Sequence, residues 1–364
     1  MTDADDSGRF LLAKNGNDAI TALTQREKLI LNEIVQHFID SAAPVSSNLI
    51  ARKPGIGMSA ATIRSIMNSL EQKGFIAQPH TSAGRVPCTS GYRVYVDELM
   101  RLGRLTPQVR EEIRDSIESH RADINAVLKE IPGIVARLAR QLSLVMPPAL
   151  KDGVFQRMEM ISLSSERLLV IITITSGMMK TLTLEIDSAI SRDHLDWVTQ
   201  IFNERLSGIK LSVIRSKFSE IISGVSSQES SLIRLFKHGA DRLFNFSEDV
   251  QLYFMGAHYM MQKPDFTDLE TVSSVIEMVE SRHILNHMLP EDLSPINPGV
   301  PLVRIGEELD NRKMQGCSLI TAQYRIGEIS GAIGILGPMR MDYGKLVALL
   351  DYTAKSLTGL QNRN

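Results

Sequence analysis

The sequence predicts an α+β protein whose N-terminal part is a winged helix-turn-helix. A capped helical pattern over residues 59–74 runs directly into a short, basic, glycine-containing hairpin. Two other helical patterns precede it, and strand and helix patterns alternate in the chain after Pro148. These observations predict a small, mainly helical module followed by a larger region that contains sheets.

The helix over residues 59–74 has clear start and stop signals. Ser59 can accept a hydrogen bond from a free backbone N–H of the first turn, and Gly74 tolerates the left-handed conformation that ends a helix. Apolar residues recur at i, i+3, i+4 and i+7, which predicts one buried stripe. The stripe consists of Ile63, Ile66, Met67 and Leu70.

The opposite face of this helix carries small and uncharged polar side chains with one arginine. Asn and Gln can bond adenine bidentately, Arg can do so to guanine, and Ala or Ser lets a helix approach the bases closely. An ordinary surface helix is polar outside as well, so this face alone leaves both interpretations open. The residues expected at a DNA groove are Ser59, Ala61, Thr62, Arg64, Ser65, Asn68 and Gln72.

The upstream context favours DNA. Thr24 and Glu27 have the spacing of a capping box, and an amphipathic stripe follows and ends near Pro44. A second short helix is expected over residues 46–52. Three helices in this order match the helix-turn-helix, in which the second helix of the pair enters the major groove. The stripe consists of Leu29, Ile30, Ile34, Phe38 and Ile39.

The residues after the third helix predict a wing. Residues 75–77 are a strand candidate, residues 82–85 form a turn with a basic tip, and a return strand begins next. A wing of this kind would place Arg85, with His80 and Ser82 near it, against phosphate or the minor groove.

A further helix opens at Gly91, with Tyr92 and Arg93 in its first turn. A phenol and a guanidinium can both bond phosphate, so we include both residues among the DNA candidates. Packing explains Tyr92 equally well.

Charge supports this interpretation locally. The whole chain has a net charge of −2, but residues 24–105 carry ten Lys and Arg against six Asp and Glu, a net +4. The remainder is acidic, at −2 for residues 1–23 and −4 for residues 106–364. A modest local charge suggests that a dimer supplies enough phosphate contacts, with an affinity that falls as salt rises.

The rest of the chain predicts a second domain interrupted by an insertion. A charged helix over residues 111–131, broken by Pro132-Gly133, is followed by a second helix to about Val145. Three strands over residues 155–163, 167–175 and 180–186 form an antiparallel meander, and a helix follows over 193–206. Strands over 318–326 and 328–335 and a helix over 342–360 close the chain.

Residues 212–298 are the expected insertion. They contain two helical patterns, over 228–246 and 268–289, and a strand-like piece over 251–255. The second helix has a broad apolar face that serves either an ordinary core or a contact with a second copy of the chain. The expected division is a flexible extension over 1–22, a winged helix over 23–105, a second domain over 106–211 and 299–364, and the insertion over 212–298.

Several strings closely resemble HrcA, the family of bacterial heat-inducible transcription repressors. They are ATIRSIMNSLEQKGFIAQPHTSAGRVP, GYRVYVDEL, YFMGAHYMMQKPDFTD, CSLITAQY and GILGPMRMDY, and the likeness covers about residues 23–360. The resemblance implies a winged helix, a GAF-like domain and an inserted dimerising domain. It further implies a homodimer on the CIRCE inverted repeat ahead of chaperone genes, assisted into its active form by the GroE chaperonin.

Other functions have little support in the residues. Gly55-Ile56-Gly57-Met58-Ser59-Ala60 matches a dinucleotide fingerprint, but Arg52-Lys53-Pro54 stands where a buried strand is required, so we interpret these glycines as a turn. His258, His283 and His287 do not form a clear metal-ligand pattern. No nucleophile, base or paired-carboxylate arrangement stands out. We therefore expect neither an enzyme nor a cofactor.

The compartment follows from the cysteines and the hydropathy. Cys88 and Cys317 are far apart in sequence, so neither a disulfide framework nor zinc spacing is available, and a reducing cytoplasm is expected. Cys88 is either a redox-sensitive thiol near an arginine or a small packing residue. The most apolar stretch, residues 168–174, is too short to cross a bilayer, and the acidic start differs from a signal peptide.

Two functions rival the dimeric DNA-binding repressor. The first is a ligand-gated regulator that binds a small molecule in the GAF-like domain. The second is a scaffold whose winged helix docks protein instead of DNA. Ligand-dependent operator affinity would favour the first, and the absence of sequence-dependent retardation in a mobility shift would favour the second.

Overall fold

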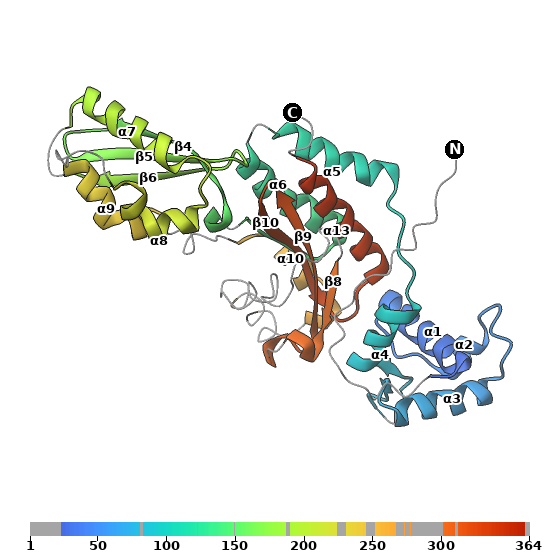
Figure 1. The fold of residues 1–364 in the computed structure, drawn as a ribbon. Helices are drawn as coiled ribbons and strands as arrows, with labels where there is room; N and C mark the ends of the chain where they lie inside the picture. Colours follow the sequence, from blue (N-terminus) through green and yellow to red (C-terminus); the bar gives the residue numbers. More distant parts are fainter. Residues whose placement is uncertain are drawn as a thin grey trace.

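The protein consists of three bodies arranged in a row (Figure 1). The structure is a computed structural model that describes residues 23–266 and 301–360, apart from gaps at 81–82, 122, 149, 187–189, 224–230, 245–251 and 310–311, together with Ser273 and Glu277. A winged helix stands at one end, a domain with a five-stranded sheet in the middle, and a three-stranded sheet with helices at the other end. The predicted α+β class is confirmed.

The winged helix has the predicted order of elements. The capping box at its start is present, because Thr24 Oγ1 accepts from the Glu27 backbone N–H and the Glu27 carboxylate accepts from the Thr24 N–H. Within the first helix Leu29 is 40% exposed, so its expected place in the buried stripe is wrong, and Leu31 and Val35 are buried instead. The elements are α1 (Gln25–Ser41), α2 (Ser47–Ala51), α3 (Ala60–Gln72), β1 (Ile76–Ala77), β2 (Val86–Pro87), α4 (Thr89–Val94) and the π-helix η1 (Tyr95–Leu99).

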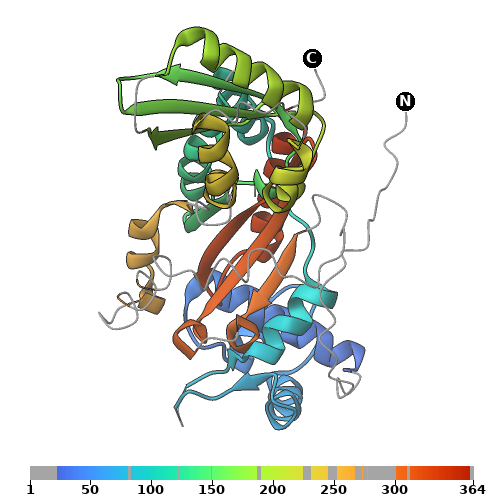
Figure 2. The same ribbon diagram turned by 60° about the vertical axis from the view of Figure 1, so that its left-hand side comes forward.

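The middle domain is the expected GAF-like domain, with an antiparallel sheet in the order β7-β3-β10-β9-β8. Figure 2 shows this sheet between the winged helix and the third body. Helices α6 and α13 cover one face, while α10 and short 3-10 turns cover the other. Its elements are α5 (Pro107–Ser119), α6 (Ile124–Ala139), β3 (Leu142–Met146), β7 (Tyr253–Met255), α10 (Ala257–Met261), η3 (Pro264–Phe266), β8 (Leu302–Ile305), η4 (Gly306–Leu309), η5 (Arg312–Met314), β9 (Cys317–Ile326), β10 (Ile329–Pro338) and α13 (Tyr343–Thr358).

The predicted helices before this sheet need two corrections. The break lies at His120–Asp123, where Asp123 caps α6 by accepting from the N–H groups of Asn125 and Ala126, and Pro132 lies inside α6. The second helix ends at Ala139, and residues 142–146 form strand β3. All five residues of β3 are buried. Its sequence therefore lacks the polar alternation that marks a strand with one solvated face.

The third body contains the predicted three-strand meander. Strands β4, β5 and β6 pair antiparallel in that order, and the helices α7, α8 and α9 bury a separate core against one face. The open face of the inserted sheet, as we call the other face, carries Ile161, Leu169, Ile171 and Met179, which are half-buried or exposed. The elements are η2 (Leu150–Asp152), β4 (Phe155–Ser162), β5 (Arg167–Ile174), β6 (Met179–Glu185), α7 (Arg192–Leu206), α8 (Leu211–Ile221) and α9 (Ser231–Leu243).

The insertion is present, but its predicted boundaries are wrong. We expected it to begin at residue 212, whereas the chain leaves the middle sheet after β3 and rejoins it at β7. The meander of residues 155–185 therefore belongs to the inserted domain, because it forms its own sheet. The helix expected over residues 268–289, which the sequence offered as a possible contact with a second copy, lies outside the described residues except for Ser273 and Glu277, and the extension over 1–22 lies outside them entirely.

Candidate nucleic-acid interface

Helix α3 is positioned by its cap and its apolar stripe. Ser59 Oγ accepts from the Thr62 backbone N–H at 3.1 Å, which fixes the first turn. Ile63, Met67 and Leu70 are buried in the winged-helix core, whereas Ile66 is only partly buried. Gly55 and Gly57 have φ values of +86° and +60° in the turn that leads to this helix. This positive φ explains the glycines without a nucleotide site.

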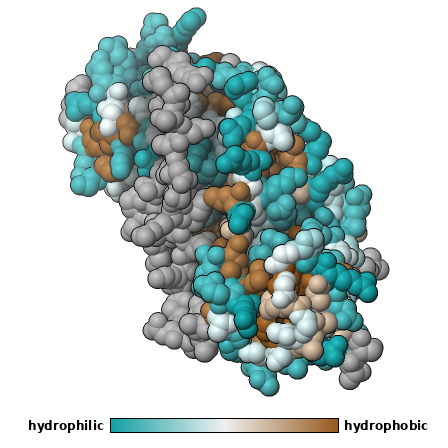
Figure 3. Space-filling view, turned by 90° about the vertical axis from the view of Figure 1, so that its right-hand side faces the viewer, coloured by the Kyte–Doolittle hydropathy of each residue, from teal (hydrophilic) through white to brown (hydrophobic). Residues whose placement is uncertain are grey.

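The outward face of α3 is open. All seven residues expected there are exposed: Ser59, Ala61, Thr62, Arg64, Ser65, Asn68 and Gln72. The helix lies on the side of the winged helix farthest from the middle domain (Figures 1 and 2). Figure 3 views the molecule from the winged-helix end, where teal, hydrophilic surface surrounds a white-to-brown, less polar centre of this module.

Arg64 is the charged side chain that this face offers for direct contact. Within the part of the chain that the structure describes, it has no ion-pair partner, whereas Lys28, Lys53 and Lys73 are each paired with a glutamate. A guanidinium without a protein carboxylate keeps its donors available for a base or a phosphate. Several of the basic side chains counted in the sequence are thus paired within the module, while its net charge of +4 is unchanged by this pairing.

The wing is a small three-stranded arrangement. Ile76 pairs with Pro87 and Ala77 with Val86, and the Val45 and Arg85 backbones exchange hydrogen bonds of 2.8 and 2.9 Å. A Cβ at Gly84 would lie 2.4 Å from the Val45 carbonyl oxygen, so this close approach requires glycine. His80 is exposed near the turn, while Ser82 lies outside the described residues.

Arg85 stands at the base of the wing beside α3, so the expected basic tip is wrong. Its Nη2 pairs with Glu71 Oε2 at 2.8 Å and approaches Asn68 Oδ1 at 3.5 Å. Because its backbone pairs with Val45, the side chain is directed along α3 and is 15% exposed. Arg85, Asn68 and Arg64 nevertheless share one face, since Arg64 and Asn68 are one helical turn apart.

Tyr92 and Arg93 do not belong to this face, so the DNA contact expected of both is wrong, and the packing alternative for Tyr92 is the one that the structure supports. Tyr92 is 1% exposed, with its ring 6.1 Å from that of Tyr343 in the middle domain. Arg93 donates to the Glu308 carboxylate and to the Val303 carbonyl oxygen, which also belong to the middle domain. Helix α4 begins at Thr89 and packs against that domain, so Tyr92 and Arg93, near its end, make contacts inside the protein.

Glu27 holds α3 in place through contacts that its sequence position did not predict. Besides capping α1, its Oε1 accepts from Lys73 Nζ at 2.6 Å and from Ser69 Oγ at 2.8 Å. The Lys73 hydrogen bond is the largest of the effects that lower the pKa of Glu27 to about 2. This carboxylate therefore ties the end of α3 to the start of α1. The capping-box spacing identified Glu27 but not its contact with α3.

Cys88 precedes α4 and is half-buried. Burial and the nearby Glu71 carboxylate raise the pKa of its thiol. A raised pKa disfavours the thiolate, which supports a packing role over redox sensing.

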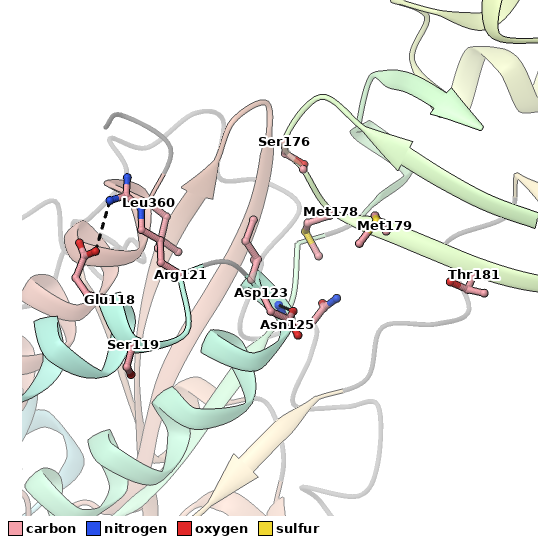
Figure 4. Close-up of a pocket in the computed structure, with 12 residues that line it drawn as sticks. Glu118, Ser119, Arg121, Asp123, Asn125, Ser176, Met178, Met179, Thr181 and Leu360 are labelled. Atoms are coloured by element: carbon pink, nitrogen blue, oxygen red, sulfur yellow. Dashed lines mark hydrogen bonds and ion pairs between the residues drawn. The ribbon is translucent and has the colours of Figure 1, made fainter. Parts of the chain in front are cut away.

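Alternative sites have less support. Among the described residues, no three His, Cys, Asp or Glu side chains could share a metal ion; His283 and His287 lie outside this set. No helix in the same residues is long and apolar enough to cross a membrane. One cavity among the described residues is a cleft of about 980 Å³ between the α5–α6 turn and the β5–β6 turn (Figure 4). The side chains of Glu118, Arg121, Asp123, Ser176 and Met178 are among those that line it.

Comparisons with known proteins agree with this architecture. Residues 125–347 match the family model described as HrcA protein C terminal domain. The heat-inducible transcription repressor HrcA of Chlorobium phaeobacteroides is 38% identical over 347 residues, covering 92% of this chain and 97% of that protein. The protein of the same name from Chlorobium chlorochromatii is 39% identical over 339 residues, with the same coverage of both chains. A crystal structure of a hypothetical protein at 2.2 Å resolution has a TM-score of 0.57 at 22% identity over 93% of this chain and 98% of its own, and shows the fold alone.

Proposed function

The chain belongs to the HrcA family of heat-inducible transcription repressors, and from this premise we propose that it represses chaperone genes by inserting α3 into the major groove of an inverted-repeat operator. The family is one of transcription repressors, not of enzymes. The observation that carries the proposal is the open face of α3: Arg64, Ser65 and Asn68 are exposed, and the helix lies on the side of the winged helix farthest from the middle domain (Figure 1). An Arg and an Asn one turn apart suit a guanine and an adenine in one groove.

Two-fold symmetry is the second part of the proposal. A homodimer places two winged helices on successive half-sites, and the CIRCE repeat has the matching symmetry. The open face of the inserted sheet is the proposed contact, because Ile161 and Leu169 are cross-strand partners there and Ile171 lies next to them, bordered by Glu159, Thr181 and Thr183. Ile171→Glu should lower the sedimenting mass to that of one chain. Val213→Glu is the control, since Val213 is 41% exposed on α8, on the helical side of this domain.

A mobility shift tests the DNA proposal directly. The unaltered protein should retard a duplex with the CIRCE repeat and release it as salt rises. A duplex of the same composition with scrambled half-sites should bind much more weakly. Equal retardation of both duplexes would refute sequence reading, and retardation of neither would favour the protein-docking scaffold.

The GroE chaperonin is the proposed activator. When heat fills the chaperonin with unfolded clients, less repressor would reach its binding-competent state, and transcription would rise. A small shift between two states of similar free energy is sufficient for this response. Operator binding after refolding should therefore increase when GroE is added, and a GroE-independent yield would contradict this part of the proposal.

A ligand-gated regulator is the second candidate, and the cleft in Figure 4 favours it. The cleft joins the middle domain to the inserted domain, and both charged and apolar side chains line it. A small molecule held there could couple the two domains. Operator affinity that changes with a bound metabolite, without any effect of GroE, would favour this candidate.

A further inference from the structure

We propose that Arg93 and Arg340 are positioning residues that hold the winged helix in one orientation on the middle domain, so that the dimer measures the spacing between its two half-sites. This inference rests on the proposed operator binding. It concerns neither base contact nor dimer contact, because both arginines lie between the two domains of a single chain.

Arg93 forms the first clasp, from the winged helix to the middle domain. Its Nε donates to Glu308 Oε1 at 2.8 Å, and its Nη2 pairs with the other oxygen of the same carboxylate. Nη2 also donates to the Val303 carbonyl oxygen at 2.8 Å, at strand β8. The side chain is 16% exposed. A bidentate, mostly buried pair fixes direction as well as distance.

Arg340 forms the second clasp, in the opposite direction. Its Nη1 donates at 2.9 Å to the carbonyl oxygen of Ile39, in the last turn of α1. Its Nη2 and Nε bond the two oxygens of Asp265, at 2.6 and 3.3 Å. The side chain is 10% exposed. A cation at the C-terminal end of a helix also interacts favourably with the helix dipole.

The linker between the two domains adds a third attachment. The Gly103 N–H donates to the Gly344 carbonyl oxygen at 3.0 Å. A Cβ at Gly344 would lie 2.3 Å from the Arg101 carbonyl oxygen, and one at Gly103 would lie 3.0 Å from the Lys345 Cα. The two backbones thus touch where the chain passes from one domain to the next.

Three separated attachments restrict rotation as well as translation. Domains joined by a short linker ordinarily move relative to one another unless their interface is extensive. Here the last turn of α1, the last turn of α4 and the linker are all fixed to the middle domain, while α3 lies on the far side of the winged helix (Figure 1). Each base pair added between half-sites moves one site by roughly 3.4 Å and turns it by about 35°. A rigid winged helix cannot follow that turn.

Operators with altered spacing test the inference in the full-length protein. Affinity is measured for the inverted repeat with its own spacer, with one or two base pairs added, and for a duplex with one half-site. The variants are Glu308→Gln, which keeps the side-chain shape, and Arg340→Ala. The matched control is Arg114→Ala, because Arg114 is 59% exposed and pairs with its neighbours on α5.

The unaltered protein and Arg114→Ala should lose at least about tenfold in affinity when two base pairs are added. Glu308→Gln and Arg340→Ala should bind the half-site within about twofold of the unaltered protein, but discriminate between spacers by less than about threefold. Trypsin cleavage at Arg101 and Arg104 in the linker should also accelerate in both variants. The rate of trypsin cleavage thus reports, in the absence of DNA, whether the winged helix has become more mobile relative to the middle domain.

The inference is overturned if both variants keep the spacing profile and the trypsin rate of the unaltered protein. It is also overturned if they lose half-site and repeat affinity equally, since that result indicates damage to the reading surface. If the unaltered protein binds neither the repeat nor the half-site, operator binding itself is refuted, and the inference fails with it.

Discussion

Helices α3 and α4 lie in the same winged helix, and each has small residues in its first turn and an arginine as its fifth residue, but their surroundings are opposite. The outward side chains of α3 are exposed, and Arg64 has no carboxylate partner among the described residues. The corresponding side chains of α4 are enclosed, because Tyr92 and Arg93 pack against the middle domain. The comparison teaches that polar side chains on a helix indicate a ligand-binding surface only where no other domain of the protein covers that helix.

Replacing Tyr92 tests the enclosed half of the comparison and has the largest expected effect. Tyr92→Ala removes a fully buried ring and should lower the free energy of unfolding by about 3–5 kcal/mol in a denaturant titration. Tyr92→Phe is the control, because the hydroxyl is buried without a hydrogen-bond partner among the described residues and its loss should change stability little. An unchanged stability in Tyr92→Ala would mean that the residue is solvated after all.

Glu27 tests how firmly the open helix is held. Its pKa of about 2 lies below the ordinary 4.5, so its contribution to stability is complete above pH 4.5 and is lost as the pH falls toward 2. Glu27→Gln should therefore lower stability at pH 7 and flatten the acid limb of an unfolding-versus-pH curve. Glu111→Gln, at a 63% exposed position on α5, should leave that curve unchanged.

Arg64 and Asn68 test the open half directly. Arg64→Ala or Asn68→Ala should weaken binding to the matched operator by about 1–3 kcal/mol and relax base preference at one position. Stability should change by less than about 0.5 kcal/mol, since both side chains are exposed. Equal losses on matched and scrambled operators would instead assign these residues to the phosphate backbone.

Arg85 lies between the exposed face of α3 and the interior of the winged helix, and its replacement has the smallest expected effect on DNA affinity. Because it lies beside α3 and is already paired with Glu71, Arg85→Ala should weaken matched and random DNA alike by about 1 kcal/mol. The slope of affinity against salt should decrease by about one. If Arg85→Ala leaves both affinities and the slope intact, the wing makes no phosphate contact.

Capping residues and apolar periodicity were sufficient to predict the helices and strands that have one face exposed to solvent. The caps at Thr24 and Ser59 and the three alternating strands of the meander lie where the patterns predict them. Strand β3 and helix α6 were misread for one shared reason. Both are buried in the middle domain, so β3 shows no alternation, and packing of the apolar face of α6 tolerates Pro132 inside the helix.

The amino-acid sequence by itself determined the winged-helix module, its open polar helix and the general plan of a sheet domain with an insertion, because caps, periodicity and turns act over a few residues. Only the tertiary structure decided which polar residues remain available. Arg93 and Arg340 meet partners more than 200 residues away in the chain, and Glu27 reaches the end of α3 across the module. Contacts between distant segments leave no periodic trace, and for that reason they became visible only in the fold.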